Sequence, residues 1–112
     1  MDKLTNYKKT VRSILEHYVA TAKPHFADTE VYLVADDEHG QYLLFHNSWR
    51  DERRNYGCFL HVRMKNQKVY VESDGSDSGF TNDFLQAGIP KEDIVLAFQA
   101  PSKRPYSGFA VA

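Results

Sequence analysis

The fold is decided by the alternating segment Tyr56-Gly57-Cys58-Phe59-Leu60-His61-Val62-Arg63-Met64. Successive side chains of a strand point to opposite faces, so this pattern predicts a half-buried strand. One face of it would carry Cys58, Leu60, Val62 and Met64. Cys58 is therefore expected in the core rather than as a nucleophile. The turn-forming residues 65–68 and the returning extended run 69–72 complete a predicted hairpin.

A similar pair of extended segments precedes this hairpin. Residues 30–35 and 41–46 are rich in strand-forming side chains, and the polar, glycine-bearing stretch 36–40 between them predicts a second hairpin. Upstream, residues 2–22 repeat apolar side chains at spacings of three and four, which predicts a long amphipathic helix. Pro24 is expected to end that helix, because proline removes a backbone donor.

The C-terminal third is less regular. Residues 80–87 predict a short helix, with Asp77 or Ser78 as candidate N-caps and Gly88 after its end. Residues 94–98 form a fifth extended run that is too apolar to stand as a bare sheet edge. This run either joins the sheet or is covered by a second copy of the chain, so a homodimer is a possible assembly.

These segments predict an α+β fold. A long N-terminal helix would pack on an antiparallel sheet built from two hairpins, followed by a second short helix and a short C-terminal strand. The length of 112 residues predicts a single domain spanning residues 1–112. Apolar residues make up 42% of the chain and aromatic residues 13%, which excludes an intrinsically disordered protein.

Charge and cysteine content narrow the functional classes. The 14 Lys and Arg residues are balanced by 15 Asp and Glu residues, whereas a stand-alone DNA-binding domain normally shows a basic excess. A single cysteine excludes an internal disulfide and fits a reducing compartment. No apolar run reaches the roughly 20 residues that span a bilayer, and residues 1–6 show no secretory signal, so a cytoplasmic location without membrane contact is expected.

Three chemical hypotheses can be drawn from the polar residues. A metal site is not expected, because the histidines lack ligand-type spacing. A metal-dependent nuclease would use His61 with Glu72 and Asp74, but no lysine completes the usual set, so a solvated acidic loop is preferred. A DNA-binding factor would need one basic surface built from Arg50, Arg53, Arg54, Lys65 and Lys68. The stretch 47–55, which holds the three arginines, is interpreted as a solvated turn. The prediction is therefore a protein with no catalytic residues, metal or cofactor.

Longer segments resemble one known family. They include Trp49, the pair Arg53-Arg54 and Tyr56-Gly57-Cys58 leading to His61, and above all residues 88–98, which read Gly-Ile-Pro-Lys-Glu-Asp-Ile-Val-Leu-Ala-Phe. The C-terminal part adds Pro101, Arg104, Tyr106 and Phe109-Ala110-Val111. In this order the chain is similar, over essentially its whole length, to the XisI family, the fdxN-element excision controlling factors of filamentous cyanobacteria.

The resemblance implies a specific role. Members of this family are required, together with an XisH-type protein, for a DNA rearrangement that excises an element from the chromosome during heterocyst differentiation, while a separate recombinase cuts and rejoins the DNA. We therefore expect a non-catalytic accessory factor that acts through protein–protein interaction. Exposed aromatic and arginine side chains are favoured at interfaces. The candidate partner-binding residues are Trp49, Arg53, Tyr56, His61, Arg104 and Tyr106. The alternatives are a small DNA-binding recombination directionality factor or the nuclease described above.

Overall fold

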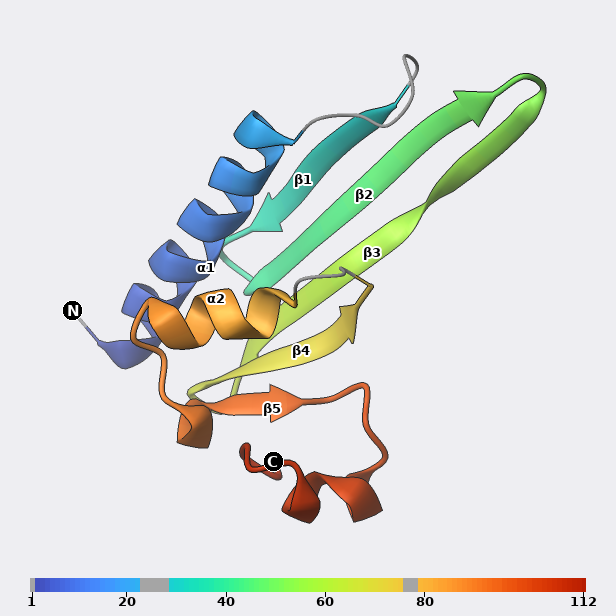
Figure 1. The fold of residues 1–112 in the computed structure, drawn as a ribbon. Helices are drawn as coiled ribbons and strands as arrows, with labels where there is room; N and C mark the ends of the chain where they lie inside the picture. The colour runs from blue at the N-terminus through green and yellow to red at the C-terminus, as the bar shows by residue number, and fades with distance from the viewer. Residues whose placement is uncertain (1, 23–28, 76–78) are drawn as a thin grey trace.

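The computed structural model describes residues 2–22, 29–75 and 79–112. Pro24, Asp77 and Ser78, which were predicted to stop the first helix and cap the second, lie outside these ranges. The elements, in chain order, are α1 Lys3–Thr21, β1 Glu30–Asp36, β2 Gln41–Arg50, β3 Arg53–Lys65, β4 Lys68–Asp74, α2 Phe80–Gln86, the 3₁₀ turn η1 Lys91–Asp93, β5 Ile94–Leu96 and the 3₁₀ turn η2 Pro101–Tyr106 (Figure 1).

The described residues form a five-stranded sheet in the order β1-β2-β3-β4-β5. The first four strands form an antiparallel meander, whereas β5 pairs with β4 in parallel, from Val69↔Ile94 to Val71↔Leu96. A parallel neighbour requires a crossover, and α2 lies within it. The predicted α+β architecture is thus confirmed. The apolar run 94–98 joins the sheet through its first three residues, so it does not require a second copy to cover it.

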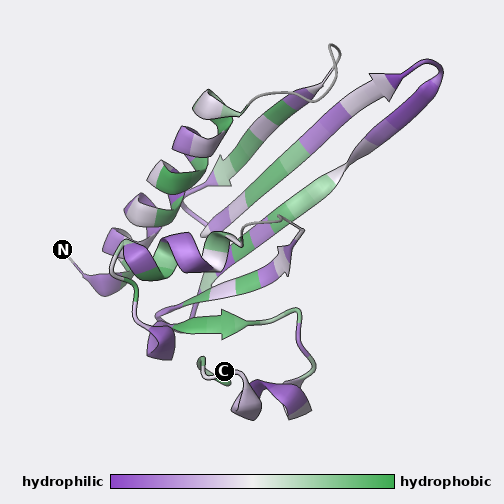
Figure 2. Cartoon of the chain, in the orientation of Figure 1, coloured by the Kyte–Doolittle hydropathy of each residue, from purple (hydrophilic) through white to green (hydrophobic). Residues whose placement is uncertain are grey.

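Helix α1 and helix α2 cover the same face of the sheet. The Asp2 side chain accepts a hydrogen bond from the backbone N–H of Thr5 at 2.8 Å, which caps the first turn of α1. The apolar stripe of α1 then faces the strands, and Figure 2 shows hydrophobic colour concentrated in β5 and in the parts of the strands nearest the helices. The buried core contains Val11, Leu15, Tyr42, Leu44, Leu60, Val62, Met64, Val69, Val71, Phe80, Phe84, Ile89 and Ile94.

The stretch 47–55 is not the solvated turn that we predicted. Strands β2 and β3 continue through it, paired from Asn47↔Tyr56 to Arg50↔Arg53, and only two residues make the turn. Asp51 takes a φ of 57°, in the left-handed region that aspartate tolerates better than most residues. The tight turn allows these polar, arginine-rich segments to pair as strands. The side chains of residues 49–55 remain exposed, whereas Ser48 is buried.

The expected position of Cys58 is also wrong. The pairing shifts between Leu44↔Leu60 and Phe45↔Cys58, which leaves Phe59 as an extra residue in β3. Such a bulge reverses the alternation of side chains on the strand beyond it. Phe59 consequently packs against the core, and Cys58 lies exposed on the opposite face.

Candidate functional site

The ends of β2 and β3 project beyond the rest of the sheet. The pairing of β1 with β2 stops at Glu30↔Asn47, and the pairing of β4 with β3 stops at Leu60↔Asp74. Residues 48–55 therefore form a two-stranded ribbon, seen as the long hairpin at the upper right of Figure 1. Its tip is hydrophilic in Figure 2. We refer to residues 48–55 as the ribbon.

An arginine lies between two exposed aromatic rings at the base of the ribbon. The guanidinium carbon of Arg54 is 4.5 Å from the centre of the Tyr56 ring and 5.8 Å from that of Trp49. Its Nε also donates to the side-chain oxygen of Asn47 at 3.0 Å, which fixes the orientation of the group. Trp49 is 45% exposed and Tyr56 53% exposed. The two aromatic rings and the Arg54 guanidinium are thus available for contact with another molecule.

This cluster continues onto the sheet face opposite the helices, which we call the outer face. Tyr32 of β1 stacks on Phe45 of β2, with ring centres 5.6 Å apart and planes only 9° from parallel. The ring of Phe45 lies 6.1 Å from that of Tyr56. We define the aromatic patch by the residues Tyr32, Phe45, Trp49, Arg54 and Tyr56. From this set, sequence reasoning proposed only Trp49 and Tyr56 as partner-binding residues, and it assigned a role to Arg54 only in the DNA-binding hypothesis. Tyr32, Phe45 and Arg54 join the aromatic patch through the strand register.

Arg53 lies on the other side of the ribbon. It pairs with Arg50, one position from the Trp49↔Arg54 pair, so its side chain alternates away from the aromatic patch. Ser48, Asn55 and all three arginines of the ribbon, Arg54 included, line a hollow of about 320 Å³. The arginine that contacts the exposed rings is therefore Arg54, whereas Arg53 was the predicted contact residue.

His61 lies on the outer face, nearer the middle of β3. Its Nε2 donates to the side-chain oxygen of Gln41 at 2.8 Å. Burial, and to a smaller extent the charge of Arg63, lowers the pKa of His61, although Glu72 acts in the opposite direction. The lowered pKa favours the neutral form of His61, whose side chain lies within a cross-strand hydrogen bond.

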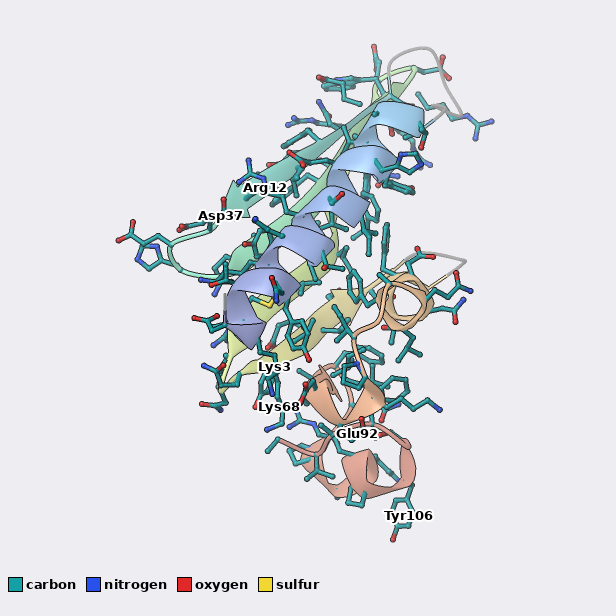
Figure 3. All side chains as sticks on the ribbon, turned by 90° about the vertical axis from the view of Figure 1, so that its left-hand side faces the viewer. Lys3, Arg12, Asp37, Lys68, Glu92 and Tyr106 are labelled. Carbon is teal, nitrogen blue, oxygen red and sulfur yellow. The ribbon has the colours of Figure 1, made fainter. Side chains whose placement is uncertain are left out.

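The two C-terminal candidates lie at the opposite end of the molecule. The Arg104 guanidinium donates to the backbone carbonyls of Gln99 and Ala97, both at 3.1 Å, so it ties the tail together. Tyr106 is 87% exposed, and Figure 3 shows it projecting from the lower end of the molecule. The six predicted residues thus do not converge. Trp49, Arg53 and Tyr56 lie at the ribbon end, His61 lies further along β3, and Arg104 and Tyr106 lie in the tail.

The three side chains of the nuclease hypothesis each have a partner of their own. His61 bonds Gln41, as described above. The Glu72 carboxylate lies 3.9 Å from the Arg63 guanidinium across β3 and β4. The Asp74 carboxylate accepts a hydrogen bond at 3.0 Å from the backbone N–H of Phe80, the first residue of α2. Over residues 2–22, 29–75 and 79–112, no group of three or more histidine, cysteine or acidic side chains is placed to hold a metal ion.

The basic residues of the DNA-binding hypothesis are divided between two ends of β3. Arg50, Arg53 and Arg54 lie on the ribbon, whereas Lys65 and Lys68 flank the turn between β3 and β4. Eleven positions of β3 separate Arg54 from Lys65, which is roughly 35 Å of strand. The five charges do not line one surface, so the condition that this hypothesis required is not met.

The fold and these surfaces define a small α+β domain with one helix-covered sheet face and an arginine-bearing aromatic patch on the other. The family model described as XisI protein matches residues 1–111, and the chain belongs to the XisI family. A crystal structure of a XisI-like protein from Anabaena variabilis is 32% identical and covers 97% of this chain and 99% of its own, with a TM-score of 0.89.

A second solved structure agrees with this assignment. The fdxN element excision controlling factor XisI from Anabaena variabilis is also 32% identical, covers 99% of this chain and all of its own, and superposes with a TM-score of 0.83. A comparison with curated protein sequences gave no significant match. Among the helices of the described ranges, none has the length and apolarity to cross a bilayer.

Proposed function

We propose that this chain is a non-catalytic factor that controls excision of a DNA element by contacting a second protein of the XisH type. Membership of the XisI family supports the excision role, since one 32% identical relative is named as an excision controlling factor. The setting implied by the family resemblance is the cytoplasm of a filamentous cyanobacterium during heterocyst differentiation.

The observation that carries the proposal is the exposed Trp49–Arg54–Tyr56 cluster. Trp, Tyr and Arg are the residue types most enriched among the side chains that dominate binding energy at protein interfaces. Here an arginine already oriented by Asn47 lies against both rings, so little side-chain freedom would be lost on binding. The ribbon also extends past its neighbouring strands, which allows a partner to reach both of its faces.

Copurification with an XisH-type protein tests the proposal. Trp49→Ala and Arg54→Ala should each weaken capture by at least about 30-fold, the change expected when a side chain worth about 2 kcal/mol is truncated. Phe98→Ala is a matched control, because Phe98 is an aromatic residue that is 52% exposed and lies outside the aromatic patch. Circular dichroism checks that each variant folds.

Two results would count against this function. Failure of the wild-type chain to retain the XisH-type protein would remove the proposed partner. A gel shift of a DNA duplex taken from the end of the element would instead favour the DNA-binding alternative, if the shift is seen at low salt and is lost in the arginine variants.

A further inference from the structure

The free edge of β1 is long and regular. Within the described ranges β1 has one strand neighbour, β2, and the two pair without a register shift from Glu30↔Asn47 to Asp36↔Gln41. The other edge of the sheet is different, because β5 has only three residues and Ala110 bridges to it at Val95. The backbone N–H of Ala110 donates to the carbonyl of Ile94 at 2.9 Å, which satisfies part of that edge.

Over residues 30–36 the β1 strand contains no proline, no lysine and no bulge. Natural edge strands are blunted by proline, lysine, bulges or inward-pointing charges. The central residues of β1 read Val-Tyr-Leu-Val-Ala from position 31 to 35, and the strand contains no bulge. Val34, near its middle, is 45% exposed on the outer face. Such an edge is a ready template for another strand.

A groove runs beside this edge. A hollow of about 490 Å³ lies between α1 and β1, lined by Arg12, Glu16, Val19, Ala20, Tyr32, Leu33 and Ala35. Figure 3 shows α1 lying alongside β1, with Arg12 and Asp37 close together on this side of the molecule. A strand added to β1 would direct every second side chain towards this hollow, the arrangement used when peptides bind between a sheet edge and a helix.

The charges around the edge indicate what kind of strand fits. Glu30 lies at the beginning of β1, and Asp36 lies at its end, followed by Asp37 and Glu38. The one arginine that lines the groove, Arg12, already pairs with Glu16 and Asp37. Glu30 makes the beginning of the edge acidic. At its end the three acidic residues Asp36, Asp37 and Glu38 outnumber His39 and Arg12, which pair with Asp36 and Asp37. A second copy pairing antiparallel about the strand centre would place Glu30 opposite Asp36 of the other copy, and like charges in that position are destabilising.

We propose that β1 and the groove beside α1 form a β-augmentation site for an extended segment of a partner protein, with an alternating apolar centre and basic residues at both ends. The inference rests on the proposed function in one respect, because the partner protein supplies the strand. It names a surface other than the aromatic patch, so the two can be tested separately.

The test uses synthetic peptides and the full chain labelled with ¹⁵N. The peptide RTVTVTVTK should cause saturable amide shifts in β1 and in the groove-lining turns of α1, and the acidic-ended peptide ETVTVTVTE should bind at least tenfold more weakly. Val34→Lys and Ala20→Arg should each weaken binding by at least tenfold. Val111→Lys is the matched control, because Val111 is 52% exposed outside the sheet and should leave binding unchanged.

Several outcomes would overturn the inference. These are the absence of saturable shifts in β1 at peptide concentrations up to about 1 mM, equal binding of the two peptides, and normal binding by Val34→Lys. Shifts in β1 that depend on protein concentration without peptide would identify a second copy as the occupant and would equally refute it. The Val34→Lys variant could capture the XisH-type protein as well as the wild type does, while Trp49→Ala remains defective in capture. That result would reject the edge site and leave the proposed function intact.

Discussion

The thiol of Cys58 should react rapidly with an aromatic disulfide reagent while the protein is folded. The bulge at Phe59 turns this residue to the outer face, where it is exposed, although its thiol donates to the carbonyl of Leu60 at 3.1 Å. A core thiol would react only when the domain opens. At about 0.05 kcal/mol per residue, the 112 residues give an unfolding free energy of about 5.6 kcal/mol, or a roughly 10⁴-fold slowing. We expect Cys58 to be slowed by less than about tenfold relative to the unfolded chain.

The absence of any other cysteine makes the assay unambiguous, because the release of the coloured thiolate reports one site. The matched control is Val62→Cys in a chain that also carries Cys58→Ser, since Val62 is fully buried on the helix-covered face. That thiol should show most of the 10⁴-fold protection. If Cys58 reacted as slowly as the buried control, and only at the rate of global opening, the assigned register of β2 and β3 would be refuted.

Three further predictions concern elements that hold the fold together. Asp93→Asn should lower the unfolding free energy at pH 7 by about 1.5 kcal/mol in urea, because a neutral amide replaces the charged acceptor of the Tyr7 hydroxyl and the ion pair with Lys3 is lost. That hydrogen bond, with nearby Lys3, lowers the pKa of Asp93 below its usual 3.8. The difference in unfolding free energy between wild type and variant should therefore be complete above pH 4 and disappear as the pH falls through the depressed pKa. Burial and Asp93 raise the pKa of Tyr7 from 10.0 to about 12, so this contribution to stability should be present below pH 10 and lost as the pH rises through 12; a flat profile would contradict the pairing. Gly40→Ala should lower the melting temperature by about 8 °C, or about 2 kcal/mol, because φ is +64° and the new Cβ would lie 2.8 Å from a methionine side chain. Gly57→Ala, whose Cβ meets nothing within 3.8 Å, should change it little. Arg104→Ala should increase proteolysis of the tail without changing partner capture, and a large loss of capture would instead place Arg104 in the interface.

Local periodicity predicted the core-facing parts of the helices and strands, but it predicted neither the extension of β2 and β3 through residues 47–55 nor the strand register. The stripe that buries Val11 and Leu15 in α1, and the alternation that buries Leu60 and Val62 in β3, are each visible within a short window of sequence. The bulge at Phe59 is not, because it depends on which residue of β2 lies opposite. The parallel pairing of β5 is equally a long-range property, since it depends on the crossover through α2.

The same distinction separates the predicted from the missed residues of the aromatic patch. Exposure of Trp49 and Tyr56 follows from their place in a polar segment, and the structure places both in solvent. Selecting Arg54 rather than Arg53 required strand pairing to continue through residues that read as a turn. If the alternation of side chains in β3 had been extended towards the N-terminus through residues 53–55, it would have placed Arg54 on the same face as Tyr56. Stacking of Tyr32 on Phe45 could be recognised only once β1 had been aligned with β2.

The parallel pairing of β5 with β4 also has a consequence for biosynthesis. The meander β1–β4 can form as soon as the nascent chain has passed Asp74. The edge of β4 that pairs with β5 stays unpaired until residues 94–96 have been synthesised. At translation rates of about 5–20 residues per second, that interval lasts roughly 1–4 s. During it the growing polypeptide presents the backbone of β4 beside the side chains of Val69 and Val71, which are fully buried in the finished protein. Ribosome-bound intermediates that stop short of Ile94 should therefore be the species most in need of chaperone protection.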